Sequence, residues 1–242
     1  MIPEYDIEAI PVLITSGIST ILAILISATA TAKLREKKNK IALTLCGAMY
    51  SATIGLAYTF LAQVDWFLTM YYPHTPYIYS YGGGTTYSFI AGAIVCLTQF
   101  AIYVFKWKKW YIWLSLAMAI VVIIISWHPY NWWGQIPDPG APNIRPISSI
   151  ITLLYSGVVV VRIGFGAYSA AKVASSEVIR DNFKDILKAM ILIFLTFILQ
   201  IMDNIVWAIT GWKYNPVRWF SMWPLTFGLF FLYRGFFGRK VQ

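Results

Sequence analysis

The chain has 242 residues, of which 59% are hydrophobic and only 12% are charged, and its formal net charge is +9. A soluble globular domain carries about 25% charged residues, so this chain could not cover a water-exposed surface. Its two cysteines and apolar composition also exclude disulfide-rich secreted and disordered classes. The composition predicts an integral membrane protein, with residues 1–242 forming one transmembrane domain.

Seven stretches are apolar and long enough to be considered membrane spans, which need about 20 residues as helices. Their apolar runs are continuous and do not show the alternating polarity of β-barrel strands. The sequence therefore predicts an all-α bundle of seven transmembrane helices. In chain order the expected spans are residues 11–32, 41–64, 84–105, 110–127, 147–171, 189–211 and 217–237.

Basic residues are concentrated at one end of this predicted bundle. Of the 19 lysines and arginines, 15 lie between spans one and two, three and four, five and six, or at the C-terminal end of the seventh. Positive loops stay cytoplasmic, so we expect the N-terminus outside and the C-terminus inside. The bias explains the net charge without nucleic acid and favours contact with anionic lipid head groups. We expect a multi-pass protein of a prokaryotic-type plasma membrane.

The loops at the two ends differ in character. On the basic side, residues 172–188 carry apolar residues at helical spacing and are expected to extend the fifth or sixth helix. On the other side, residues 65–83 and 128–146 are rich in aromatic residues and proline. They indicate either an interfacial aromatic belt or a lid over a ligand site. The outer candidates for binding are Asp65, Trp132 and Trp133.

Some residues within the spans predict how the helices pack. Gly47, Ser51 and Gly55 form a row of small residues on the second span, which favours close contact with another helix. Pro224 should kink the seventh span. Cys46 and Cys96 lie in different spans and are expected to be small buried residues.

An ionisable residue within a span is a candidate functional residue. Asp203 in the sixth span shares a helix face with Gln200, Asn204 and Trp207, at spacings of three, four and seven residues. Arg162 is the ionisable residue of the fifth span. We expect these five residues to form a ligand or ion site or a structural polar network. Whether Arg162 pairs with Asp203 or reaches toward the inner interface stays open.

Motifs of enzymes and cofactor sites are missing from the sequence. It has no recognisable nucleophile–base motif, so we expect no enzyme activity, and it predicts neither a metal site nor a cofactor. The segment Asp65–Thr69 resembles the DWxxT stretch of microbial rhodopsins. The lysine that binds retinal in that family is absent from residues 217–236, so the chain is assigned to no family.

Three functions are consistent with these features. The leading one is a small receptor-like or sensory membrane protein that passes a signal from an intramembrane polar site to a separate partner chain. The second is a transporter or channel that uses the Asp203 carboxylate. The third is a non-catalytic subunit of a larger membrane complex.

Overall fold

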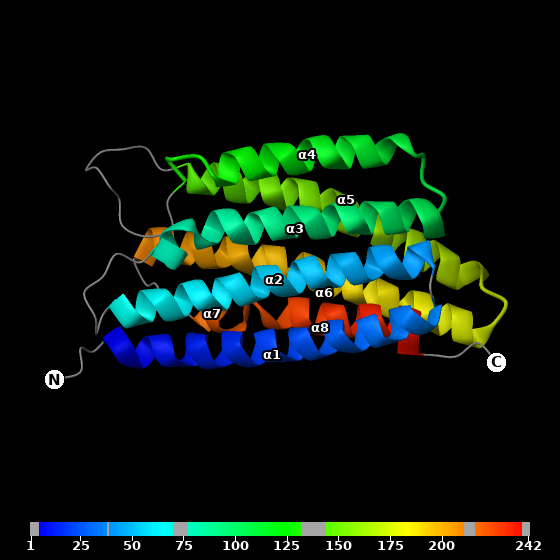
Figure 1. Cartoon of the computed structure of the whole chain (residues 1–242), viewed down its shortest axis with the longest axis horizontal. Coiled ribbons are helices and arrows are strands. Elements are labelled where there is room, and N and C mark those ends of the chain that lie inside the picture. The colour runs from blue at the N-terminus through cyan, green and yellow to red at the C-terminus, as the bar shows by residue number, and fades with distance from the viewer. Residues whose placement is uncertain (1–4, 38, 70–76, 132–143, 211–215, 239–242) are drawn as a thin grey trace.

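A computed structural model describes residues 5–37, 39–69, 77–131, 144–210 and 216–238, all in helices and short connections. Figure 1 shows the long helices running side by side along one axis. The start of α1 lies at one end of the bundle and the end of the last helix at the other. The elements are α1 (Tyr5–Lys37), α2 (Lys40–Thr69), α3 (Tyr77–Val104), α4 (Trp110–Ser126), α5 (Arg145–Val173), α6 (Glu177–Thr210), α7 (Pro216–Phe220), α8 (Trp223–Tyr233) and the π-helix η1 (Arg234–Gly238).

Five of these helices, α1, α2, α3, α5 and α6, are long and apolar enough to cross a bilayer. The all-α prediction is confirmed, and the five corresponding stretches are helical. The chain thus has the character of a polytopic membrane protein. Residues 172–188 behave as predicted, because Lys172 and Val173 end α5 and residues 177–188 form the start of α6, which extends the sixth helix toward the basic end.

The seventh predicted span is wrong as a single helix. It is divided into α7, a bend at Ser221–Met222, α8 and η1. Pro224, which we expected to kink the helix, lies in the first turn of α8, where its missing N–H costs no intrahelical bond. The bend is stabilised by hydroxyl groups, since Ser19 Oγ donates to the Met222 carbonyl over 3.2 Å and also bonds the Thr226 hydroxyl.

From α1 to α6, each helix packs on the next along the chain, and α8 closes the ring by packing on both α6 and α1, while the short helix α7 contacts the same two helices. The helix α4 is peripheral, because α3 and α5 contact each other directly. Its 17 residues bury only a narrow stripe of small side chains. These are Ser115, Ala119, Val122 and Ser126.

The outward faces of the helices are strongly apolar. Trp113 is 72% exposed on α4, Val158 is 67% exposed on α5 and Ile209 is 78% exposed on α6. In water such a surface would drive aggregation, whereas a lipid bilayer accommodates it. The surface therefore supports contact with lipid along the length of the bundle.

Inside the ring, hydroxyl groups join neighbouring helices. Ser27 of α1 bonds Thr53 of α2 at 2.7 Å. Ser115 of α4 joins both Thr98 of α3, at 3.1 Å, and Tyr155 of α5, at 2.7 Å. In a bundle surrounded by lipid, such bonds and close packing hold helices together, since burial of apolar surface contributes little.

Small residues bring the backbones of α2 and α3 close together, as the sequence predicted. A Cβ on Gly47 would lie 3.1 Å from Cys96 Sγ, and Ser51 Oγ lies 3.5 Å from the Cβ position of Gly92. Cys46 is buried and Cys96 partly buried, and both are free thiols.

The closest approach is that of the C-terminal elements to α6, and it requires glycine. A Cβ on Gly228 would lie 2.9 Å from Ile193 Cγ1 and 3.3 Å from the Ala189 carbonyl oxygen. Seven residues later, a Cβ on Gly235 would lie 2.8 Å from the Asn182 carbonyl oxygen. One face of α8 and η1 therefore touches α6 nearly backbone to backbone.

We expect Gly228→Ala to destabilise the protein by about 1–3 kcal/mol, because the added methyl group must separate α8 from α6. Thermal unfolding of the purified chain in detergent measures the effect. The matched control is Gly92→Ala, whose Cβ meets only ordinary contacts at 3.5 Å or more and should change stability by less than about 0.5 kcal/mol. Equal effects of the two substitutions would contradict this account of the α6–α8 contact.

Candidate functional site: two ion pairs between α6 and the C-terminal helices

Asp203 lies on α6 and is 8% exposed. Its carboxylate is bound by Arg218 of α7, whose Nε lies 3.1 Å from Oδ1 and 3.0 Å from Oδ2. Nη2 of the same arginine lies 2.9 Å from Oδ2. The two side chains are only 12% and 16% exposed. The Asp203–Arg218 pair is therefore a largely desolvated, charge-assisted contact.

The broken seventh helix positions Arg218. Pro216 begins α7, and after one short turn the Ser221 hydroxyl donates to the Arg218 carbonyl over 3.0 Å. The bend that follows directs the chain into α8. A continuous seventh helix would contain no such turn. The break in this helix and the Asp203–Arg218 ion pair are therefore parts of one local structure.

Arg162 does not pair with Asp203. It is exposed on α5, and its guanidinium carbon lies 4.9 Å from the Trp107 ring centroid and 4.5 Å from that of Tyr111. Trp107 lies in the turn between α3 and α4, and Tyr111 lies in the first turn of α4, at the basic end of the bundle. Of the possibilities that the sequence left open, the structure shows the one in which Arg162 reaches away from Asp203.

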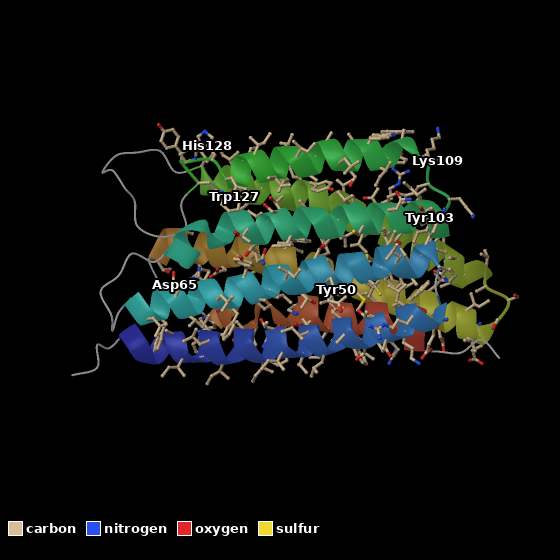
Figure 2. All side chains as sticks on the ribbon, viewed as in Figure 1. Tyr50, Asp65, Tyr103, Lys109, Trp127 and His128 are labelled. Atoms are coloured by element: carbon tan, nitrogen blue, oxygen red, sulfur yellow. The ribbon has the colours of Figure 1, made fainter. Side chains whose placement is uncertain are left out.

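The other predicted site residues are only partly described. Gln200, one turn before Asp203, lines a central cavity of about 40 Å³ and a second one of about 10 Å³. The side chains of Asn204 and Trp207 lie outside the described residues, as do Trp132 and Trp133 entirely. Asp65 is partly buried near the end of α2, and Figure 2 places it at the same end of the bundle as Trp127 and His128.

The central cavity is small and mostly apolar. Its polar side chains are Thr196 and Gln200, and it is otherwise lined by apolar residues of α2, α3, α6 and α8. Its volume of about 40 Å³ admits a few water molecules, whereas drug-sized ligands occupy about 300–1,000 Å³. In the described part of the chain, no group of three or more His, Cys, Asp or Glu side chains could hold a metal ion.

A second ion pair, which the sequence analysis missed, joins α6 to η1 at the basic end. Asp185 of α6 is 1% exposed. Arg234, the first residue of η1, donates from Nε to Oδ2 over 2.7 Å and from Nη2 to Oδ1 over 2.6 Å. Lys188 lies 3.9 Å from the same carboxylate. The fork of the guanidinium thus matches the carboxylate bidentately.

Known proteins give no further guide to this site. No known protein family, no curated protein and no solved structure matches the chain. Function must therefore be argued from the site itself.

The two ion pairs tie α6 to the broken seventh helix at both of its ends. Asp185 and Asp203 are 18 positions apart on one helix, which is about 27 Å at 1.5 Å per residue. The hydrocarbon core of a bilayer is about 30 Å thick. The separation of the two pairs along α6 is therefore close to the thickness of the hydrocarbon core, and the bend at Ser221–Met222 lies between Arg218 and Arg234 along the chain.

Proposed function

We propose that this protein is a small receptor-like or sensory protein of the plasma membrane, which transmits a change from its outer end to its cytoplasmic end. The observation that supports this is the double attachment of α6 to the broken seventh helix. Asp203–Arg218 provides an input at one end, and Asp185–Arg234 holds the output elements at the other. A small ion, a proton or a charged group that competes for either partner of the outer pair would release α7.

The connection from input to output follows the packing. The helix α7 has five residues and is joined to α8 by a two-residue bend, so release of Arg218 allows α7 to move. Since α8 and η1 both pack on α6, movement of α7 alters the packing of η1 on α6 near Asp185. A π-helix such as η1 is rare in proteins overall, and the π-helices that do occur are often found at functional sites. The output surface then includes the start of α6, where a separate partner chain would bind.

The proposal includes an orientation. The C-terminal ends of α1, α3, α5 and α8, which are Lys37, Val104, Val173 and Tyr233, lie at the same end of the bundle in Figure 1, so the basic segments that follow them gather there. Because positive charge is retained in the cytoplasm, we propose that this end faces the cytoplasm and that the Asp203–Arg218 pair lies toward the outer side.

Cysteine labelling tests this orientation. In a chain with Cys46 and Cys96 replaced by alanine, Asn39→Cys should be labelled by an impermeant maleimide only after the cells are opened. Tyr130→Cys should be labelled on intact cells. The reverse pattern, or labelling of both in intact cells, would contradict the proposed topology.

Spin labels test whether the two ends are coupled. Labels at Lys109 and Arg180, both exposed, report the distance between the α3–α4 turn and the start of α6. With the chain in lipid nanodiscs, Asp203→Asn mimics release of the outer pair and should shift or broaden this distance distribution. The matched control, Asp181→Asn, removes a carboxylate whose side chain is 33% exposed and should leave the distribution unchanged. Identical distributions in both variants and the unaltered chain would overturn the sensory proposal.

A transporter is the second candidate, and the discontinuous seventh helix favours it. Broken helices next to charged residues form the substrate sites of many transporters. Proton or sodium flux into liposomes distinguishes the two functions. A sensory protein should give no flux above empty liposomes, whereas flux that Asp203→Asn abolishes would replace the sensory proposal with transport.

A further inference from the structure

Arg162 has an unusual environment for a charged residue on an outward-facing helix surface. Its neighbours one turn before and after on α5, Val158 and Phe165, are 67% and 68% exposed. Its guanidinium contacts the faces of the Trp107 and Tyr111 rings. It makes no hydrogen bond or ion pair with any residue that the structure describes. The N–H groups of its guanidinium therefore have no hydrogen-bond acceptor within the described part of the protein.

The position of this arginine is fixed by the turn between α3 and α4. Phe105 packs on α5 at Gly166, where a Cβ would lie 3.1 Å from the ring. Lys106 follows with φ 56°, in the left-handed region that side chains rarely adopt. This reversal places Trp107 beside Arg162, which lies one turn from Gly166 on the same face of α5. The turn thus packs on α5, and the Arg162 side chain lies between Trp107 of the turn and Tyr111 at the start of α4.

In the described part of the chain, the surroundings of Arg162 are positively charged, and no carboxylate lies within ion-pair distance of its guanidinium. Lys106, Lys108 and Lys109 are exposed on the same turn, and Figure 2 shows Lys109 at the end opposite Asp65. Among the described residues at this end, the carboxylates are paired with other cations. The pairs are Glu36 with Lys33, Glu177 with Arg180, Asp181 with Lys184, and Asp185 with Arg234.

We propose that Arg162, with Trp107, Tyr111 and the three lysines of the turn, forms a binding site for the phosphate of an anionic phospholipid. We call this set the Arg162 site. A guanidinium that stacks on aromatic rings keeps its donor edge free for bidentate binding of phosphate. Tryptophan and tyrosine are the aromatic residues preferred at the head-group level, and the lysines add attraction for a negatively charged leaflet.

The direction from which the ligand arrives identifies its source. The guanidinium emerges between Val158 and Phe165 on the face that meets lipid, so a ligand reaches it laterally, within the membrane. A phospholipid can place its phosphate at this depth while its acyl chains lie along the exposed apolar face of α5. The Arg162 site shares no residue with the two α6 ion pairs, so its test is independent of the test of the sensory proposal.

Thermal unfolding of the full chain in nanodiscs tests the site. Nanodiscs of phosphatidylcholine alone are compared with nanodiscs that also contain phosphatidylglycerol. The anionic lipid should raise the thermal midpoint of the unaltered protein by about 2–4 °C. Arg162→Gln should lose most of this gain. In phosphatidylcholine alone it should unfold at or near the midpoint of the unaltered protein, because it also relieves repulsion from the lysines.

The matched control is Arg35→Gln. Arg35 is exposed at the same end, but on α1, at the opposite edge of the bundle from α4 in Figure 1. This variant removes the same charge and should keep the full gain from phosphatidylglycerol. If Arg162→Gln keeps it as well, or if both variants lose it equally, the proposed site is wrong.

Two further measurements cover the remaining outcomes. If Arg162→Gln does not fold, Arg162→Lys keeps the charge without the guanidinium and should retain part of the gain in thermal midpoint. A full gain would contradict phosphate binding by the guanidinium.

Inorganic phosphate added to phosphatidylcholine nanodiscs should not reproduce the effect. If it does, the source is a soluble anion and the lipid assignment is overturned. A partner protein that elutes with the unaltered chain but not with Arg162→Gln, without any lipid effect, would replace the lipid with a protein ligand.

Discussion

Arg234→Gln should lower the thermal midpoint of the protein in detergent by roughly 10 °C, which corresponds to about 3–5 kcal/mol. The substitution removes both short bonds to Asp185, whose side chain is 2% exposed, while Lys188 stays 3.9 Å from the carboxylate. Breaking a buried pair on one side costs far more than the pair itself contributes, because the remaining charge stays out of water after losing its strongest partner.

The reciprocal substitution should cost less. Asp185→Asn leaves Arg234 unpaired, but this side chain is 35% exposed and its charge can reach water. The control is Arg180→Gln, which removes an exposed contact of 3.6 Å to Glu177 and should change stability by less than about 0.5 kcal/mol. If Asp185→Asn destabilises the protein more than Arg234→Gln, the desolvation argument for the inner pair is wrong.

Asp203→Asn should destabilise the protein by about 2–3 kcal/mol, measured as a lower thermal midpoint. It removes the carboxylate that Arg218 binds, and the side chain of Arg218 is 16% exposed. The amide oxygen of asparagine still accepts one bond from the guanidinium, so the loss should be smaller than for Arg234→Gln. The control Asp181→Asn removes an exposed contact and should have little effect.

The double variant Asp203→Asn with Arg218→Gln separates the charge effect from the packing effect. Removing both charges should recover most of the stability, with a coupling energy of about 1–3 kcal/mol between the two positions. It should also fold but no longer transmit a change to the basic end. Additive losses without coupling would show that the Asp203–Arg218 contact contributes no net stability.

Hydropathy was sufficient for the long helices and insufficient for the seventh. The apolar stretches that became α1, α2, α3, α5 and α6 are continuous, so length and composition define them. Pro224 indicated an irregularity in the last stretch. The bend itself depends on hydroxyl groups of Ser19 and Thr226 from two different helices, and no local pattern encodes that contact.

The candidate site was recovered only in part, for a similar reason. Asp203 was recognisable because it interrupts an apolar stretch. Its partner Arg218, at the start of the predicted seventh span, was not recognised, because the short helix and bend that bring it to Asp203 have no periodic pattern in the sequence. Asp185 was missed because the apolar stretch was started at residue 189, whereas α6 begins at Glu177. On the longer helix, Asp185 falls on the same face as the buried Ala189 and Ile193.

The order in which the ion pairs are completed has a consequence for biogenesis. Asp203 precedes Arg218 by 15 residues and Asp185 precedes Arg234 by 49, and a chain emerges from the ribosome N-terminus first. The helix α6 therefore enters the bilayer before the arginine partners of its two carboxylates have been placed. Pairing with these arginines requires α7, α8 and η1 to insert against α6, so α6 and the broken seventh helix must be integrated together. A nascent chain halted before Arg218 would lack the arginine partners of both Asp203 and Asp185.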